Sequence, residues 1–352
     1  MAVTGMQETN RDFRSDNIAG MAPEILDALA AANTGAAAAY GDDDWSRALD
    51  GAFSALFDTD CRVFPVATGT AANALSLAAI CPPHGAVYAH RDAHIVVDEC
   101  NAPEFFTGGA KLMTLPGDSG KIDMAALRAA LGMGWAGVQH HPQPSAVSLT
   151  QATESGTVYA PDEVAAIAHL CRDHGLRLHM DGARFANAVA GLNCSPADLT
   201  WRAGVDVLSF GATKNGAMAA EAVVFFRPEL AEGFLFRRKR AAHLFSKMRF
   251  LSAQLLAMLE DGLWLRLARD ANARARQLAD GLVRLPGIEI VWPVQANEVF
   301  VRLPAERAAA MQQQGFLFHP WSWDAAEGVH RFVCAFDKTE ADVAALLAAA
   351  AG

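Results

Sequence analysis

The amino-acid sequence predicts an α/β fold with two parts. The first is a large domain with a mostly parallel sheet between helices, and the second is a smaller α+β C-terminal domain. Strand-like and helical patterns alternate as far as Phe226, which is typical of parallel sheets covered by helices on both faces. After Phe226 long helical patterns dominate, and short strands follow them. The length of 352 residues is sufficient for two domains.

Two prolines mark the first elements of the large domain. Pro23 suits the first turn of a helix, whereas Pro65 makes the first strand an imperfect one. The predicted helices are residues 24–32, a stretch from the polar loop 40–44 to about 57, and then 71–80, 123–131, 161–174 and 184–190. The predicted strands are residues 62–66, 85–89, 111–115, 176–180, 205–210 and 222–226.

The C-terminal part begins with a long helical stretch. Residues 228–285 are nearly all helical, and short strands and helices then alternate at 288–291, 298–303, 305–314, 330–335 and 340–350. Because no low-complexity linker is visible, we expect the domain boundary inside the helical stretch. The predicted division is a large domain of residues 1–250 and a small domain of residues 251–352.

Composition and charge exclude several classes of protein. Acidic residues outnumber basic ones by 39 to 29, and a net charge of −10 argues against nucleic acid as a partner. No apolar run is long enough to span a membrane, and the first ten residues do not resemble a signal peptide. Six cysteines without a Cys-x-x-Cys pair predict reduced, mostly buried thiols. We therefore expect a cytoplasmic enzyme without a membrane or nucleic-acid partner.

Three motifs are better explained without a function. Residues 132–137 match G-x-G-x-x-G, but they follow a helix rather than a strand, which favours a connecting loop. The acidic and histidine residues between His90 and Glu99 lack zinc-type spacing, so we expect no metal and at most one functional histidine among solvated polar groups. The basic run 237–240 predicts a solvated helix face, with an anion site at a subunit boundary as the alternative.

Three further segments suggest one shared site. Residues 67–71 form a small-residue turn from a strand into a helix, where backbone amides bind anions. Asp181 ends a buried strand, at the edge where open α/β sheets place their ligands. Lys214 follows another apolar strand among small residues, which would keep its amine partly desolvated, as a nucleophile requires.

This ordered set resembles the sequence pattern of fold-type I pyridoxal 5'-phosphate (PLP) enzymes. In such enzymes a lysine forms a Schiff base with PLP, a carboxylate keeps the pyridine nitrogen protonated, and amides hold the phosphate. A more specific resemblance covers nearly the whole chain from about residue 12. It is to the L-threonine aldolases of the aldolase/β-eliminating lyase group, through residues 12–17, 40–43, 67–73, 92–95, 179–184 and 296–301. The sequences of residues 213–216 and 221–224 resemble those of the phenylserine aldolase-like branch.

The resemblance implies how PLP would be held. Lys214 would bind it covalently, and Asp181 would pair with its pyridine nitrogen. Arg184 would hydrogen-bond the phenolic oxygen, and His94 would stack on the ring. The phosphate would be bound by Gly69 and Thr70, with Arg249 from a neighbouring subunit.

The resemblance also implies a substrate site. Ser15, in an N-terminal segment of residues 1–20 that contributes to the active site, and Arg331 would hold the substrate carboxylate, with Arg184 assisting. Tyr40 would approach the substrate. A homodimer or homotetramer is expected, because one site would use residues of two chains.

One position departs from the family pattern. The family segment Glu-Asn-Thr-His corresponds here to residues 151–154, so Glu154 takes the place of a histidine near the substrate hydroxyl. The general base is therefore His94, Glu154 or a water between them.

The activity implied is cleavage of L-β-hydroxy-α-amino acids, such as L-threonine, L-allo-threonine and L-phenylserine, to glycine and an aldehyde. The alternatives are another PLP-dependent reaction, namely β-elimination or transamination, and a non-enzymatic acidic scaffold.

Overall fold

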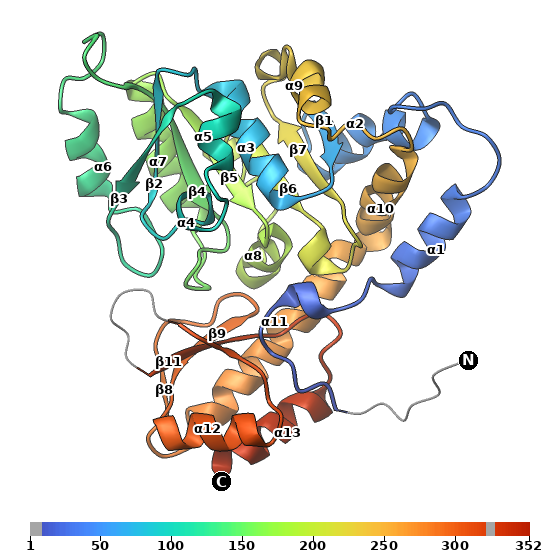
Figure 1. The fold of residues 1–352 in the computed structure, drawn as a ribbon, viewed down its shortest axis with the longest axis vertical. Coiled ribbons are helices and arrows are strands. Elements are labelled where there is room, and N and C mark those ends of the chain that lie inside the picture. The colour runs from blue at the N-terminus through green and yellow to red at the C-terminus, as the bar shows by residue number, and fades with distance from the viewer. Residues whose placement is uncertain (1–8, 322–327) are drawn as a thin grey trace.

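A computed structural model describes residues 9–321 and 328–352. Figure 1 shows a large unit, in which helices cover both faces of a central sheet, above a smaller unit that contains the C-terminus. No helix in the described ranges combines the length and the apolar character needed to cross a bilayer. The predicted α/β fold with a smaller α+β part is confirmed.

The central sheet has seven strands among the described residues. Their order is β1 (Arg62–Val66), β7 (Glu221–Phe225), β6 (Val207–Gly211), β5 (Arg177–Gly182), β4 (Gln143–Thr150), β2 (Gly85–His90) and β3 (Lys111–Leu115). Only β7 is antiparallel to its neighbours, and the other four pairings are parallel. The prediction of a mostly parallel sheet is therefore correct.

The register of the sheet places functional residues at one edge. Asp181 lies opposite Thr150 of β4 and Ser209 of β6, near the carboxyl ends of these parallel strands. In open α/β sheets this edge is the usual place for ligands. Glu221 begins the antiparallel β7 and lies opposite both Gly211 and Val66, so it reaches the same edge.

Two apolar cores flank the sheet. One face is covered by α3, α5 and α9, whose side chains pack with Phe64 and Phe225. α4 packs on the same face. The other face is covered by α1, α2, α6, α7, α8 and α10 and by the start of α11, with Phe210 in contact with Trp264. The helices are α1 (Pro23–Ala32), α2 (Asp44–Phe57), α3 (Gly69–Ile80), α4 (His94–Val97), α5 (Ala102–Thr107), α6 (Met124–Leu131), α7 (Pro161–Asp173), α8 (Phe185–Leu192), α9 (Phe234–Arg240), α10 (Arg249–Leu259) and α11 (Leu263–Leu282). Short 3-10 turns are η1 (Asp16–Ile18), η2 (Trp201–Ala203), η3 (Thr213–Asn215), η4 (Pro228–Ala231) and η5 (Glu260–Gly262).

The smaller unit has an antiparallel sheet of its own. Its order is β10 (His319–Pro320), β11 (Val329–Val333), β9 (Glu298–Arg302) and β8 (Glu289–Ile290), packed with α12 (Ala305–Gln313) and α13 (Glu340–Ala351). Early residues of α11, such as Ala268, pack into the large core, and later ones, such as Ala275, pack into the small core. The change of core thus occurs inside α11, further along the chain than the predicted division at residue 250.

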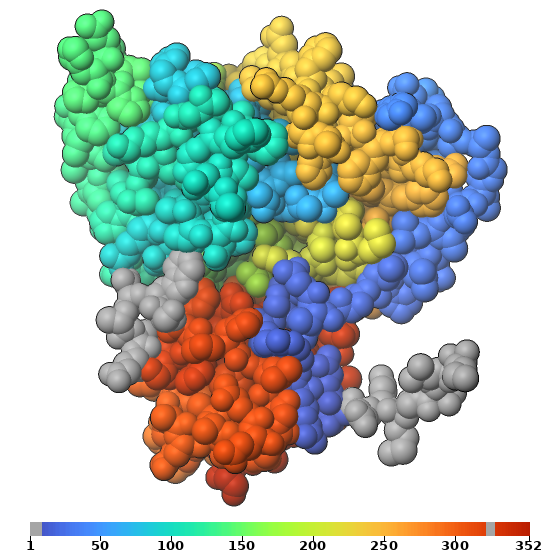
Figure 2. Space-filling model, viewed as in Figure 1, coloured from blue at the N-terminus to red at the C-terminus, as the bar shows by residue number. Residues whose placement is uncertain are grey.

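The N-terminal segment joins the two units. Phe13 is fully buried in the small core, and its backbone bonds to Leu317 and Val333. Figure 2 shows this segment lying across the junction between the two units. Residues 1–8 of the segment predicted to contribute to the active site lie outside the described ranges.

One central strand was not predicted. β4 lies between β5 and β2, yet it begins with the polar run Gln143-Pro144-Ser145. The Gln143 side chain bonds to the backbone of Gly137, Trp135, Val138 and His141, so its polarity serves the preceding loop rather than the strand. The same loop holds residues 132–137, which confirms that the G-x-G-x-x-G match is a connection.

Two expectations about solvated residues are wrong. Arg238 of the basic run is buried, with its guanidinium 5.6 Å from the ring centre of Phe64, whereas Arg237, Lys239 and Arg240 are exposed. Burial lowers the pKa of Arg238 to about 10. Glu99 is buried at the candidate site and is not a solvated residue. The expectation of mostly buried free thiols is confirmed for the cysteines of the described ranges.

Candidate active site

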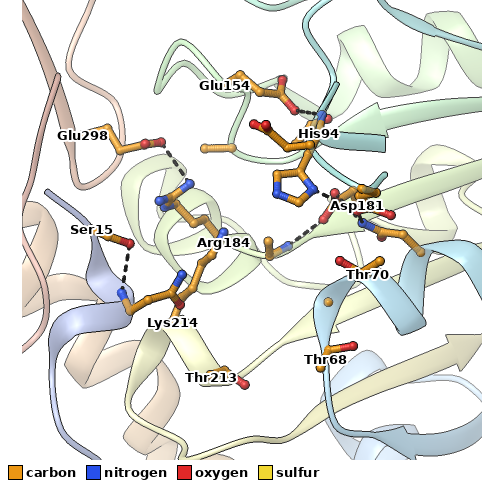
Figure 3. A pocket seen from close by; sticks show the side chains of 18 of the residues that line it. Ser15, Thr68, Thr70, His94, Glu154, Asp181, Arg184, Thr213, Lys214 and Glu298 are labelled. Atoms are coloured by element: carbon orange, nitrogen blue, oxygen red, sulfur yellow. Dashed lines mark hydrogen bonds and ion pairs between the residues drawn. The ribbon is translucent and has the colours of Figure 1, made fainter. Parts of the chain in front are cut away.

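A cavity of about 780 Å³ lies at the carboxyl edge of the central sheet, where the small unit meets the large one. Nine of the predicted site residues line it: Ser15, Gly69, Thr70, His94, Glu154, Asp181, Arg184, Lys214 and Arg331. Figure 3 shows Arg184 and Glu298 pointing toward each other, while His94 and Asp181 face the cavity from the large unit. The fold therefore brings together residues as far apart in the sequence as Ser15 and Arg331.

An anion cradle forms at the start of α3. Thr68 is its N-cap, and the Thr68 Oγ1 accepts a hydrogen bond of 3.2 Å from the Ala71 amide. The next amides, of Gly69 and Thr70, belong to the first turn, where N–H groups have no partner within the helix. Behind the turn, the Ala67 amide donates to His243 Nδ1 at 3.2 Å. This braced helix start is suited to bind a phosphate group.

Asp181 is held by hydrogen bonds on both oxygens. Its Oδ1 accepts from the Ala183 amide at 3.0 Å, and its Oδ2 accepts from Asn73 Nδ2 at 2.7 Å. Asn73, on α3, also donates to Glu99 Oε1 at 2.9 Å. The Asp181 carboxylate is therefore fixed relative to the anion cradle, with little freedom to turn away from the cavity.

Two residues before Asp181, three buried polar side chains of neighbouring strands bond to one another. His179 lies between Ser148 Oγ, 2.8 Å from its Nδ1, and Ser209 Oγ, 3.0 Å from its Nε2. Burial lowers the pKa of His179 to about 4, so the imidazole is neutral at physiological pH. A neutral, fully hydrogen-bonded histidine supports the strand that carries Asp181.

Lys214 lies in the short turn η3 directly after β6. A Cβ atom at Gly211 would lie 2.5 Å from the Ala183 oxygen, so only glycine allows this close approach of β6 to β5. Asn215 anchors the turn through Nδ2, which donates to the Trp264 oxygen at 2.8 Å. Gly216 then adopts φ +108°, which a side chain would strain. Lys214 is thus presented to the cavity by a turn that is fixed on both sides.

His94 and Glu154 form the upper wall of the cavity. The His94 amide donates to Glu154 Oε1 at 2.8 Å, and His94 Nδ1 lies 2.9 Å from Glu99 Oε1. The hydrogen bond to Glu99 raises the pKa of His94. Burial raises the pKa of Glu154 to about 7, and its Oε2 is buried without a hydrogen-bond partner among the described residues. A carboxyl group of this kind is poised to exchange a proton near neutral pH.

Arg184 is committed to a buried ion pair. Its Nε and Nη2 donate to Asp16 at 2.8 and 3.1 Å, and its Nη1 lies 3.4 Å from Glu298 Oε2. Burial acts to lower the pKa of Arg184, but the carboxylates of Asp16 and Glu298 outweigh it and raise the pKa. The guanidinium therefore stays charged at the junction of the two units.

Tyr40 and Arg249 do not line this cavity. The Tyr40 ring is half exposed, with Lys239 Nζ 5.0 Å from its centre, and its amide donates to the Ser246 oxygen. Arg249 Nη1 lies 3.4 Å from the Gly35 oxygen. The two residues belong to adjoining surface segments of the chain, so their predicted roles require a second copy.

The residues present fit PLP. The cavity offers an amine at Lys214, a fixed carboxylate at Asp181 and an anion cradle at the start of α3. In addition, the buried Glu154 Oε2 and Arg331 Nε have no hydrogen-bond partner among the described residues, as expected of groups that meet a ligand. Lys214, Asp181, Gly69 and Thr70 would hold the cofactor, and its ring would lie against His94.

Sequence reasoning did not single out several lining or supporting residues. Asp16, Asn73 and Glu298 lie inside segments on which the family resemblance rests, but nothing in the sequence shows that their side chains are buried at the site. Glu221 is another: its Oε2 accepts from the Ala212 amide at 3.0 Å, and burial raises its pKa to about 7. The available signals were its place in residues 221–224, which carry the branch resemblance, and its position as an acidic residue at the start of an apolar strand.

Comparisons with known proteins show the family of this chain. The family model Beta-eliminating lyase matches residues 12–306. The low-specificity L-threonine aldolase of a Pseudomonas species is 46% identical over 343 residues, covering 97% of this chain and 98% of that protein. The protein of the same name from Pseudomonas aeruginosa is 47% identical over 332 residues, covering 94% of each chain. A solved threonine aldolase structure from Leishmania major has a TM-score of 0.89 at 28% identity, covering 97% of this chain and 98% of that one.

Proposed function

We propose that this chain, which belongs to the beta-eliminating lyase family, cleaves L-threonine and related L-β-hydroxy-α-amino acids to glycine and an aldehyde. It is a PLP-dependent lyase with a fold-type I architecture. The observation that carries the proposal is the convergence of Lys214, Asp181 and the anion cradle in one cavity with Arg331 and Glu154. Incubation of the PLP-loaded protein with L-threonine tests it: glycine and acetaldehyde should form in equal amounts, and their absence would refute the activity.

The chain's own residues supply binding, orientation and proton transfer. When bound, PLP supplies an electron sink for the pair released at Cα as the Cα–Cβ bond breaks. Asp181 keeps a proton on the pyridine nitrogen, and Gly69 and Thr70 hold the phosphate. Arg331 and Ser15 hold the substrate carboxylate, which aligns the Cα–Cβ bond with respect to the ring. A base must also accept the β-hydroxyl proton.

Glu154 is our candidate for that base. Its Oε2 is buried at the cavity, has no hydrogen-bond partner among the described residues and belongs to a carboxyl group with a pKa of about 7. His94 is less suited, because its Nδ1 is engaged with Glu99 and its ring is the face against which the cofactor would stack. His94, or a water between the two side chains, remains the alternative that the next experiment distinguishes.

Glu154→Gln is expected to lower kcat by about 10²- to 10⁴-fold, which is the usual contribution of a general base. Because the base must be ionised, wild-type activity should fall below pH 7, where burial leaves Glu154 protonated. The variant should lose this acid limb in a kcat/KM profile from pH 5.5 to 9. A variant that keeps the limb and most of its activity would identify His94 or water as the base; His94→Asn provides that comparison.

The second candidate function is β-elimination or transamination. The family to which the chain belongs is named for β-elimination, and the same cofactor supports both reactions. The products separate the three reactions: in place of glycine and aldehyde, β-elimination would give a keto acid and ammonia, and transamination would give a keto acid and the aminated acceptor. L-serine and L-alanine with a keto-acid acceptor are suitable probes.

We extend the proposal to L-allo-threonine and to L-phenylserine, as in the phenylserine aldolase-like branch. The cavity volume of about 780 Å³, together with Trp321 in its lining, supports the acceptance of bulky or aromatic side chains. Comparison of kcat/KM for the three substrates tests this extension.

We also propose that the enzyme is cytoplasmic, since free cysteines such as the exposed Cys100 suit a reducing compartment.

We propose that the active unit is a homodimer or a homotetramer in which Arg249 serves the neighbouring site. Lys214→Ala and Arg249→Ala chains would each be impaired alone. In a reassembled equimolar mixture, half of the pairs would be mixed, and each would hold one intact site, so about a quarter of wild-type activity should return. If Arg249 acted within its own chain, mixing would restore nothing.

A further inference from the structure

A buried carboxylate lies between the two arginines of the cleft. Glu298, on β9 of the small unit, is 1% exposed, with Oε2 3.4 Å from Arg184 Nη1 and Oε1 3.8 Å from Arg331 Nη1. These contacts are ion pairs, and neither oxygen has a hydrogen-bond partner among the described residues. A desolvated carboxylate without hydrogen bonds is costly, so its position at the cavity calls for a functional reason.

The two arginines differ in how many of their N–H groups already have a hydrogen-bond partner. Arg184 already directs Nε and Nη2 to Asp16. Arg331 donates one hydrogen bond, from Nη2 to the Arg14 oxygen at 3.2 Å, and packs 5.1 Å from the ring centre of Trp321. Its Nε is buried without a hydrogen-bond partner in the part of the chain that the structure describes. Arg331 is therefore the cation that retains capacity for a substrate carboxylate, and Glu298 is the charge beside it.

The charges around this point are balanced. Two cations, Arg184 and Arg331, face two carboxylates, Asp16 and Glu298, so the junction has no net charge before substrate binds. Over the whole cavity lining, carboxyl groups outnumber cations. Six carboxyl groups, those of Asp98, Glu99, Glu154, Asp181, Glu221 and Glu298, face three cations, Lys214, Arg184 and Arg331, and the imidazoles of His94 and His319.

We propose that Glu298 is a specificity-determining residue that makes the site reject amino acids with an acidic side chain. It neutralises Arg331 in the empty site and competes with the single α-carboxylate that the substrate brings. A second carboxylate on the substrate would meet a lining in which carboxyl groups outnumber the cations. This inference rests on the proposed function, because it concerns the amino-acid substrates of the same site.

A neutral isostere at this position should change binding in a defined direction. In Glu298→Gln, Arg331 loses its competing carboxylate, and the junction gains a positive charge. PLP-loaded variant protein should therefore bind glycine at least about fivefold more tightly, as followed by the change in cofactor absorbance on titration. The ratio of kcat/KM for 3-hydroxy-L-aspartate to that for L-threonine should rise at least about tenfold.

Glu289→Gln is the matched control. Glu289 lies on the neighbouring strand β8, pairs with Arg302 at 2.9 Å and is exposed, so its loss removes a small-unit carboxylate without touching the cavity. Both the glycine affinity and the substrate ratio should stay at wild-type values. Thermal unfolding and PLP content per chain show whether each variant is folded.

Two results would overturn the proposal. Weaker glycine binding in Glu298→Gln would mean that the carboxylate aligns Arg331 for the substrate instead of competing with it, and an unchanged substrate ratio would leave Glu298 without a role in specificity. If Glu298→Gln does not fold, Glu298→Asp provides the test: its shorter side chain moves the charge away from Arg331, so the substrate ratio should rise by a smaller factor. Equal cleavage of both substrates by wild-type protein would refute the proposal. Should no substrate be cleaved while glycine still perturbs the cofactor spectrum, the proposed function fails, but the affinity comparison still decides the role of Glu298.

Discussion

Lys214→Ala is expected to abolish turnover of L-threonine, with kcat reduced by about four orders of magnitude or more. The side chain enters the cavity from a turn fixed by Asn215 and by the left-handed Gly216, and it is the only lysine that lines the cavity among the described residues. No other lysine is placed to take over its covalent role. Product analysis and mass spectrometry after borohydride reduction measure the effect: wild-type protein should retain PLP on the peptide that contains Lys214, and the variant should not.

Lys111→Ala is the control for the loss of an amine elsewhere. Lys111 is exposed on β3, away from the cavity lining, and its removal should leave both labelling and turnover unchanged. Partial recovery of the Lys214→Ala variant by added methylamine would support the role of the amine. Retention of PLP on another lysine, with turnover near the wild-type rate, would show that Lys214 is not the attachment site.

Asp181→Asn is expected to lower kcat by about 10²- to 10³-fold while the protein still folds and binds PLP. The amide has nearly the same shape, and its one oxygen can still accept from the Ala183 amide, but its NH2 group cannot accept from Asn73 Nδ2. Besides that hydrogen bond, the variant loses the negative charge that stabilises a proton on the pyridine nitrogen, and with it much of the ring's capacity to accept electrons. Steady-state kinetics and the cofactor spectrum, recorded at saturating PLP, measure the effect.

Asp206→Asn separates the loss of this charge from the loss of any buried carboxylate. Asp206 is also buried at the sheet, where its Oδ2 accepts from the Leu178 amide at 2.8 Å, but it does not line the cavity. We expect it to lower thermal stability and to leave kcat near the wild-type value. Equal loss of kcat in both variants would indicate that the Asp181 effect is structural.

Much of the fold was predictable because its elements are long and strongly patterned. The helices α6 and α7 and the strands β1 and β3 lie within one or two residues of their predicted positions. Strand β4 was not predicted, because its first residues are polar. Gln143 bonds to the preceding loop, and the strand is buried only because it lies between β5 and β2. Periodicity indicates a strand only where apolar residues mark the buried positions of that strand.

The candidate site was predictable to the extent that its residues sit in recognisable segments. Asp181 lies at the end of a strand, and Lys214 and the turn at Gly69 each follow one, so their approach to one sheet edge follows from the parallel topology. Glu99 was expected to be solvated, yet it is buried and bonded to both His94 and Asn73. Its partners come from α3 and α4, and no local pattern reveals that these two helices meet.

The sequence by itself determined the α/β alternation, the smaller C-terminal unit and the order of the cavity-forming segments, because these depend on periodicity and on local turn chemistry. Only the tertiary structure decided which charges face one another. Asp16, Arg184, Glu298 and Arg331 come from four distant parts of the chain, and their ion pairs exist because the small unit packs against the carboxyl edge of the large sheet. The electrostatics of the site depend on distances between non-adjacent segments, and those distances are fixed by packing rather than by any stretch of sequence.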